Sequence, residues 1–346
     1  MTWNWSLNEL FALERFLADM GLCHGPLTGR QIGEGHSNLT FLVGDGRRSV
    51  IVRRPPPPPM PPGAHDVVRE AQVMAALRNT PVPVTDVLAI AQPGEVLDVP
   101  MVVMSCVDGP VITTRTPEPF CNDADRRLIG NDLVDVLADL HAVDWRQCGL
   151  ADFGRPDGFN QRHLHRIARL IADGAGQLPT EFEALFTWLT STAPAESGHT
   201  VVHNDFRLGN VIVGVHPPAR IAAVLDWELA TIGDPLFDLA YLLASIPVDG
   251  QPVTPTEAMG SALLEPGYPS RFEMAERYAA ITGRDITGLS WYIAAVYWKL
   301  AVLYEYGRRR NRRGGDPYFQ DPANVQAFLA AAFRAAGHDV CGSLTT

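Results

Sequence analysis

Short apolar runs separated by turns dominate the first third of the chain. Apolar residues recur at helical spacing from Leu7 to Leu17, which predicts an amphipathic helix rather than a signal peptide. Residues 28–54 alternate β-type runs such as LTFLV and SVIVRR with glycine turns, as antiparallel hairpins do. The prolines between residues 55 and 62 predict a stiff, extended connector. The predicted elements that follow are a helix over 66–78 and strands within 84–91 and 96–104.

Longer helical patterns replace the strands after Gly109. The predicted helices cover about 123–142, 159–173, 180–192, 235–246, 270–282, 288–307 and 321–335. They surround a short β-type island at 201–226. We therefore expect an α+β, bilobal fold in which a small antiparallel β-sheet lobe with one main helix, residues 1–107, precedes a larger, mainly helical lobe, residues 108–346.

Composition narrows the class of protein further. The 346 residues carry a formal charge of −11, which argues against a nucleic-acid partner. Five cysteines are scattered without metal-binding spacing, as in proteins of a reducing compartment. Apolar stretches are too short or too interrupted to cross a bilayer. These features predict a cytoplasmic protein. Independently of them, we expect a monomer or homodimer that acts on a small molecule.

Two polar loops carry the strongest signal for chemistry. VVHNDFRLGNVIV places Asp205 and Asn210 between apolar runs, and IAAVLDWELATIGDP places Asp226 at the end of another. Phosphoryl transfer needs a carboxylate that orients the attacking hydroxyl and accepts its proton, and a carboxylate and an amide that hold magnesium. Asp and Asn also cap turns. Both loops together, in this order, favour phosphoryl transfer.

The first hairpins offer groups for a nucleotide phosphate. The segment QIGEGHSNL contains the candidate phosphate-binding residues Gly33, Gly35, Ser37 and Asn38, although a glycine pair is also ordinary in a hairpin turn. Arg53 ends the third strand and Glu70 lies on the next helix, where a kinase places its phosphate-binding cation and the acidic partner of that cation. Arg54 is an alternative for the same role, and a surface salt bridge is an alternative function for Arg53.

The segment MVVMSCVDG ends in a hinge-like Asp-Gly pair. If the two lobes meet there, Met104 flanks the adenine pocket. The backbone groups of Ser105 and Val107 then face the edge of the base.

The chain resembles the aminoglycoside phosphotransferase and choline kinase superfamily in three segments taken together. GEGHSN is similar to its nucleotide loop, HNDFRLGN to its catalytic loop, and DWELATIGDPLFDLA to its metal loop. IVRRPP and GYPSRFEMAERYAAITGRD are most similar to the subgroup related to domains fused to acyl-CoA dehydrogenases. The resemblance implies a protein-kinase-like fold and the use of ATP and Mg²⁺. It also implies that Asp205 deprotonates the substrate hydroxyl, while Asn210 and Asp226 hold magnesium.

Several residues depart from or surround this pattern. Asn204 replaces the usual glycine after the loop histidine, and Lys299 stands where the subgroup often has arginine. His203 and Asp238 are expected to be structural, with Asp238 anchoring the helical lobe. Two further acids, Glu228 and Asp234, are candidates either for supporting the metal ligands or for a structural role.

The acceptor is suggested by the basic stretch from Lys299 to Arg313, in which Glu305 is the one acid. Lys299, Tyr304 and Arg308 are the candidate substrate contacts, and their charge favours an anionic acceptor such as a hydroxy acid or its CoA thioester. Three alternatives stay open. The arginines can instead cap a helix C-terminus, the acceptor can be an aminoglycoside, and the chain can be a regulatory pseudokinase.

Overall fold

The computed structural model describes residues 5–33, 38–56, 66–311 and 319–337. The chain forms two compact units: Met1–Gly109 with Ala222–Ala230, and Pro110–Ile221 with Thr231–Thr346. The first unit thus includes a segment that lies far beyond residue 108 in the sequence. The functional division at residues 107 and 108 remains a prediction. In the described ranges no helix has both the length and the apolar character needed to span a bilayer.

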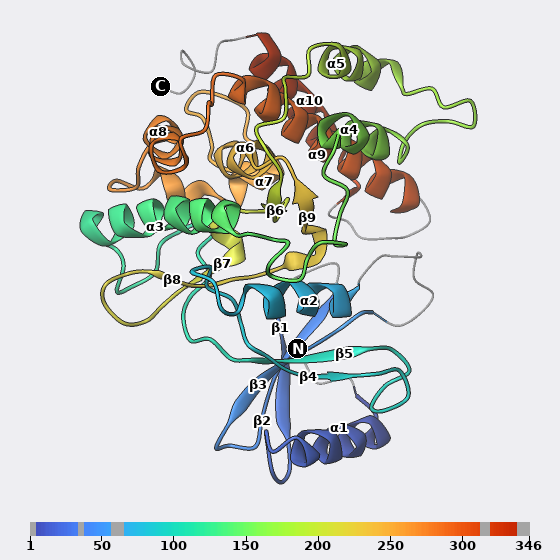
Figure 1. Ribbon diagram of the computed structural model, residues 1–346, viewed down its shortest axis with the longest axis vertical. Helices are drawn as coiled ribbons and strands as arrows, with labels where there is room; N and C mark the ends of the chain where they lie inside the picture. The colour runs from blue at the N-terminus through green and yellow to red at the C-terminus, as the bar shows by residue number, and fades with distance from the viewer. Residues whose placement is uncertain (1–4, 34–37, 57–65, 312–318, 338–346) are drawn as a thin grey trace. The chain divides into compact units, whose positions relative to one another are not determined.

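The first unit is built on a five-stranded antiparallel sheet with strand order β1-β2-β3-β5-β4 (Figure 1). Its strands are β1 (Thr28–Ile32), β2 (Leu39–Gly44), β3 (Ser49–Arg54), β4 (Val87–Ala91) and β5 (Met101–Ser105), and its helices are α1 (Leu7–Asp19) and α2 (Val67–Leu77). A capping box between Ser6 and Glu9 begins α1. The predicted small β-sheet lobe is confirmed.

Side chains on neighbouring positions of these strands point to opposite faces of the sheet. Val50 and Val52 on β3 belong to one core cluster with Leu13 and Leu17 of α1. On the other face, the Thr85 hydroxyl contacts the sulfur atoms of Met74 on α2 (3.1 Å) and Met104 on β5 (3.6 Å). This alternation decides which arginine of β3 reaches the candidate site.

The segment Ala222–Ala230 is held in the first unit by a hydrogen bond to its backbone near each end. The N–H of Val224 donates to Pro83 O (2.9 Å), and the Arg69 guanidinium donates to Ala230 O (2.7 Å). Between them lies the 3-10 turn η2 (Trp227–Leu229), and Trp227 is fully buried. Asp226 therefore belongs to the same compact unit as the sheet.

The second unit is mainly helical. Its helices are α3 (Asp123–Ala142), α4 (Phe159–Ala168), α5 (Thr180–Ser191), α6 (Leu236–Ala244), α7 (Pro255–Ala258), α8 (Arg271–Thr282), α9 (Leu289–Asn311) and α10 (Pro322–Gly337), with the short 3-10 turns η1 (Leu208–Asn210) and η3 (Ser261–Leu264). Its short strands are β6 (Thr200–Val202), β7 (Val211–Val213) and β9 (Thr231–Gly233), while β8 (Ile221–Val224) runs from this unit into the first. The predicted helical lobe is confirmed.

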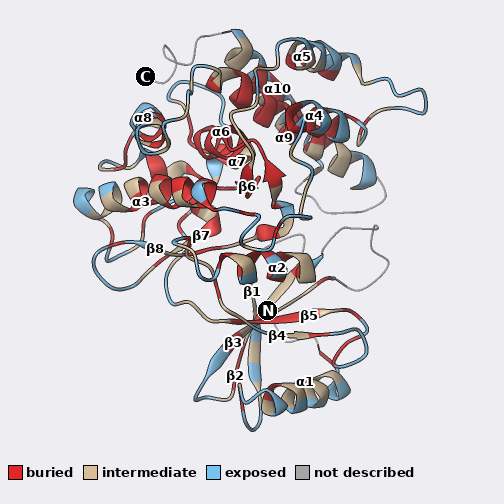
Figure 2. Cartoon of the chain, viewed as in Figure 1, coloured by how far each residue is buried: buried red, intermediate tan, exposed pale blue. Residues whose placement is uncertain are grey.

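Helix α9 forms the centre of this unit. It packs against α4, α5, α6 and α10, and Figure 2 shows that most of α6 and the middle of α9 are buried. Its sequence is apolar on all sides from Trp291 to Trp298, as expected for a helix enclosed by others. A single lysine, Lys299, follows this buried stretch.

One strand prediction needs correction. Within 96–104, only Met101 onward is a strand, because the chain turns at Gly94, whose N–H donates to Leu97 O (2.7 Å). Val96, Leu97 and Val99 are nevertheless buried in the core cluster. An apolar run signals burial, and burial here does not require an extended strand.

Candidate active site

A carboxylate and a guanidinium meet on the α2 face of the sheet. The Arg53 side chain extends from β3 and contacts both oxygens of Glu70 on α2, with Nε 3.1 Å from Oε2 and Nη2 3.4 Å from Oε1. The same Nη2 lies 2.6 Å from Oδ1 of Asp226. Arg53 thus joins Glu70 to the acidic turn that follows β8, as the sequence analysis predicted for its pairing with Glu70.

Arg54 lies on the opposite face. Its guanidinium carbon is 5.6 Å from the Trp5 ring centroid and 5.9 Å from that of Phe41. Both aromatic rings belong to the α1 core cluster. The alternation of the strand therefore brings Arg53, and not Arg54, to Glu70.

Glu70 is only 3% exposed, and Asn38 donates to its Oε1 at 2.6 Å. Burial raises the pKa of Glu70 to about 8, with the nearby charges of Asp226 and Glu228 adding to the rise and the guanidinium of Arg53 opposing it. Glu70 accordingly depends on Arg53 to hold a negative charge in this position.

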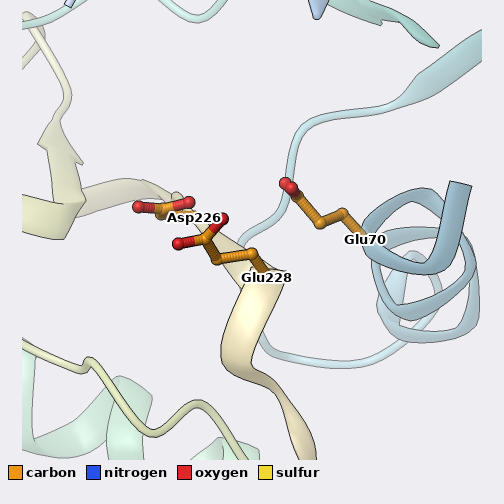
Figure 3. Close-up of side chains that lie close together, drawn as sticks. All are labelled: Glu70, Asp226 and Glu228. Carbon is orange, nitrogen blue, oxygen red and sulfur yellow. The ribbon is translucent and has the colours of Figure 1, made fainter. Parts of the chain in front are cut away.

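Asp226 and Glu228 form the acidic side of this cluster. Asp226 takes a left-handed backbone conformation (φ 65°), which begins the η2 turn. Each of Glu70, Asp226 and Glu228 offers one carboxylate oxygen within 4.8 Å of the others (Figure 3). Figure 3 shows the Glu70 side chain extending from α2 toward the other two carboxylates. Oxygen donors at this spacing suit a hard divalent cation.

The predicted nucleotide residues are only partly described. Gly33 has φ +77°, a conformation that favours glycine, whereas Gly35 and Ser37 lie outside the described residues. The N–H of Ser105 donates to Asp86 O (2.9 Å). We therefore expect only the carbonyl of Ser105 and the backbone of Val107 to contact a base. Met104 is buried at 6% exposure in the sheet.

In the second unit, Asp205 and Asn210 lie side by side. The Asn210 amide nitrogen donates to Oδ2 of Asp205 and to its backbone oxygen, both at 2.8 Å. In this orientation the amide nitrogen of Asn210 donates to Asp205, and its amide oxygen is available as a ligand for a cation. Fully buried Phe206 and Leu208 fix the loop between them.

The backbone before Asp205 is fixed by a buried carboxylate. Asp238, on α6, accepts from the N–H groups of His203 and Asn204, each at 2.6 Å. Asn204 has φ 65°, the left-handed conformation for which glycine is usual. The predicted anchoring role of Asp238 thus has a direct geometric basis.

Sequence reasoning missed two members of this anchor. His141 on α3 lies 3.2 Å from Asp238 through Nε2, and 2.7 Å from the Tyr278 hydroxyl of α8 through Nδ1. Burial lowers the pKa of His141. A lone histidine at the end of an amphipathic helix gives no sequence signal for such a contact.

The candidate substrate residues occupy three different environments. Lys299 is buried, and its Nζ donates to Asn204 O at 2.9 Å. Tyr304 is 6% exposed and packs against Phe328, with ring centroids 4.9 Å apart. Arg308 is partly exposed, but both its Nε (2.7 Å) and Nη2 (2.9 Å) donate to Glu305. The structure therefore does not gather these three side chains at one exposed surface.

The basic stretch is also less basic than its sequence suggests. Glu305 binds Arg309 (2.7 Å) as well as Arg308, so one carboxylate offsets two arginines. Arg310 contacts the Tyr306 hydroxyl (3.1 Å). Arg312 and Arg313 lie outside the described residues. Arg308 thus acts within the helix, whereas Arg309 also donates to the carbonyl oxygen of Ile171 (2.7 Å).

Comparison with known proteins identifies the family of this chain. The profile of the phosphotransferase enzyme family matches residues 28–273. The chain belongs to the phosphotransferase enzyme family. This phosphotransferase is 32% identical over 292 residues to chicken acyl-CoA dehydrogenase family member 11, and 32% identical over 233 residues to mouse family member 10. The predicted superfamily and subgroup are confirmed.

The two alignments cover 81% and 66% of this chain but only 36% and 22% of those proteins. The phosphotransferase thus spans well under half the length of these relatives. Among solved structures, a putative aminoglycoside phosphotransferase of Ralstonia eutropha is 27% identical, with a TM-score of 0.77 over 94% of this chain and 97% of that one. A type I macrolide 2'-phosphotransferase shares the fold at 20% identity, with a TM-score of 0.62 over 95% and 99%.

Proposed function

We propose that this phosphotransferase transfers the γ-phosphoryl group of ATP to a hydroxyl of a small molecule. The observation that carries the proposal is the pairing of Asp205 with Asn210 on a loop anchored by Asp238. In the proposed step, the acceptor oxygen forms a bond to the γ-phosphorus, the bond to the bridging oxygen of ADP breaks, and the hydroxyl proton passes to Asp205.

As magnesium ligands we propose Asp226 of the first unit and Asn210 of the second. Arg53 contacts one oxygen of Asp226, so the second can bind a cation, and Asn210 offers its amide oxygen. Bound Mg²⁺ would neutralise charge that develops on the phosphates. Arg53, held by Glu70, would bind a phosphate oxygen, and Gly33 and Asn38 belong to the segment proposed to cover the phosphates. Structural neighbours crystallised with ADP and with AMP-PNP support nucleotide use.

For the acceptor we propose a hydroxy acid or hydroxyacyl-CoA. Support comes from the curated relatives, which are named as members of the acyl-CoA dehydrogenase family. The intrahelical pairing of Arg308 and Arg309 weakens the charge argument, so the relatives carry more weight. An aminoglycoside is the second candidate, because several structural neighbours are named as aminoglycoside phosphotransferases. We also propose a cytoplasmic location and a monomeric or homodimeric state.

Formation of ADP with matched acceptors tests the acceptor class. Purified protein with Mg-ATP is incubated with a series of 3- and 4-hydroxyacyl-CoAs, the corresponding free hydroxy acids, and a series of aminoglycosides. We expect acceptor-dependent ADP formation and a phosphorylated product with the acyl series only. Turnover of aminoglycosides with none of the acyl series would contradict the acceptor proposal while leaving the kinase chemistry intact.

A further inference from the structure

Lys299 is the only lysine among the 346 residues of the sequence. It lies on α9 and is 5% exposed. A buried ammonium group is costly unless it is hydrogen-bonded and compensated by opposite charge. We therefore expect the Lys299 ammonium to have a hydrogen-bond acceptor and nearby negative charge.

Its contact is the backbone immediately before Asp205. Lys299 Nζ donates to the carbonyl oxygen of Asn204 at 2.9 Å. The backbone N–H of Asn204 donates to Asp238 at 2.6 Å. Asn204 is thus held from both sides in a left-handed conformation (φ 65°) that a side chain with a Cβ adopts at a cost.

We propose that Lys299 is a positioning residue, whose hydrogen bond to the Asn204 carbonyl holds the left-handed turn that presents Asp205. The inference rests on the proposed function of Asp205 in phosphoryl transfer. In this account the two residues that depart from the family pattern, Asn204 and Lys299, act together. Asn204 takes the left-handed conformation at a greater cost than glycine would, and the lysine stabilises the turn.

The charges around Lys299 determine when the bond is strongest. The interacting groups are Asn204 and Asp205 on the loop, Asp238 and Tyr241 on α6, and His163 and Arg166 on α4. Burial lowers the pKa of Lys299 to about 8, while Asp205 and Asp238 oppose that shift. Burial also moves the pKa of His163 well below, and that of Tyr241 well above, its ordinary value, so neither changes charge near pH 8.

Loss of the lysine proton above about pH 8 converts a charge-assisted hydrogen bond into a weaker neutral one. The loop should therefore be held less firmly on the alkaline side. Arginine stays charged through this range. Replacing Lys299 by arginine separates the effect of charge from the effect of packing.

The single lysine permits a direct measurement that does not depend on activity. Protein made with lysine ¹³C-labelled at Cε gives one lysine side-chain signal, and its chemical shift is followed from pH 6 to 11. We expect one titration near pH 8, well below the value of an exposed lysine. A titration at or above pH 10 would overturn the placement of this ammonium beneath the loop, whether or not the enzyme phosphorylates any acceptor.

Variants test the positioning role. We expect Lys299→Met to lower kcat about ten-fold or more, as loss of a charge-assisted bond predicts, with little change in KM for ATP and faster hydrogen exchange across residues 203–206. Methionine removes the cost of burying a charge but also removes a donor to the Asn204 carbonyl, so the melting temperature of each variant is measured at pH 7 to show that kcat is compared between folded proteins. The matched control, Leu300→Met, places the same side chain one position later and should leave kcat and loop exchange unchanged.

Two further variants complete the test. Lys299→Arg should retain kcat at pH 7 and lose less activity than wild type above pH 8. Asn204→Gly should relieve the strained turn, so Asn204→Gly/Lys299→Met should lose less activity than Lys299→Met alone. The proposal would be overturned if the activity loss of the double variant equalled the product of the losses in Asn204→Gly and Lys299→Met. It would also be overturned if Lys299→Met kept wild-type kcat and wild-type loop exchange. Equal activity of wild type and Asp205→Ala would instead contradict the proposed function.

Discussion

Two adjacent arginines of strand β3 lie on opposite faces of the sheet. Arg53 and Arg54 are chemically identical and neighbouring, yet the two-residue period of β3 directs Arg53 to Glu70 and Arg54 to Trp5 and Phe41. The sequence favours Arg53 and leaves Arg54 as an alternative, because the register of a strand decides which face each side chain occupies. The register with β2 and β5 resolves that choice.

This geometry gives a paired prediction. Arg53→Met should raise KM for ATP by about ten-fold or more, since the site loses a charged donor and leaves Glu70 buried beside other carboxylates. Arg54→Met, the matched control from the opposite face, should leave KM for ATP near wild type. Steady-state kinetics with varied ATP checks both, and an equal rise in the two variants would contradict the assigned role of Arg53.

At the scale of elements, one buried carboxylate on α6 joins the loop that precedes Asp205 to two other helices. Asp238 accepts both loop N–H groups and contacts His141 of α3, which in turn contacts Tyr278 of α8. The sequence indicated an anchor at Asp238 from its motif. It could not indicate His141, because the contact joins residues 97 positions apart.

We expect Asp238→Asn to lower the free energy of unfolding by about 3 kcal/mol, because the substitution removes a buried charge that accepts several hydrogen bonds. These bonds lower the pKa of Asp238, so its contribution is present above its ordinary value of 3.8 and is lost as pH falls. Urea unfolding at pH 7 and at pH 3 checks this. The difference from wild type should shrink at pH 3, and the exposed control Asp249→Asn should show none at pH 7. A difference that does not depend on pH would contradict a role for the charge.

Long periodic elements were the most predictable. Helices α3, α5 and α8 agree with their predicted ranges to within a residue, because each shows several turns of helical spacing. The three-residue strand β9 and the four-residue helix α7 were missed, since so few positions cannot display a period. The basic character assigned to the end of α9 was overstated, because helical spacing brings Glu305 to Arg308 and Arg309.

At the scale of the whole molecule, the candidate residues are divided between the two compact units. Arg53, Glu70 and Asp226 belong to the first, while Asp205 and Asn210 belong to the second. The motifs predict a chemical role for all five residues because each motif is short and local, and those roles stay predictions. Inclusion of Ala222–Ala230 in the first unit was not predictable from those motifs, since it depends on contacts such as that of Val224 with Pro83.

The most direct test of the account measures transfer of the γ-phosphoryl group from labelled ATP to an acceptor identified in the screen. It compares wild type with Asp205→Ala and Asp226→Ala, and ATP binding with and without Mg²⁺ is measured on the same samples. Asp205→Ala should reduce transfer about 100-fold or more and still bind ATP, because its carboxylate acts on the acceptor. Asp226→Ala should lose the Mg²⁺-dependent part of binding. Wild-type transfer by Asp205→Ala would contradict the mechanism.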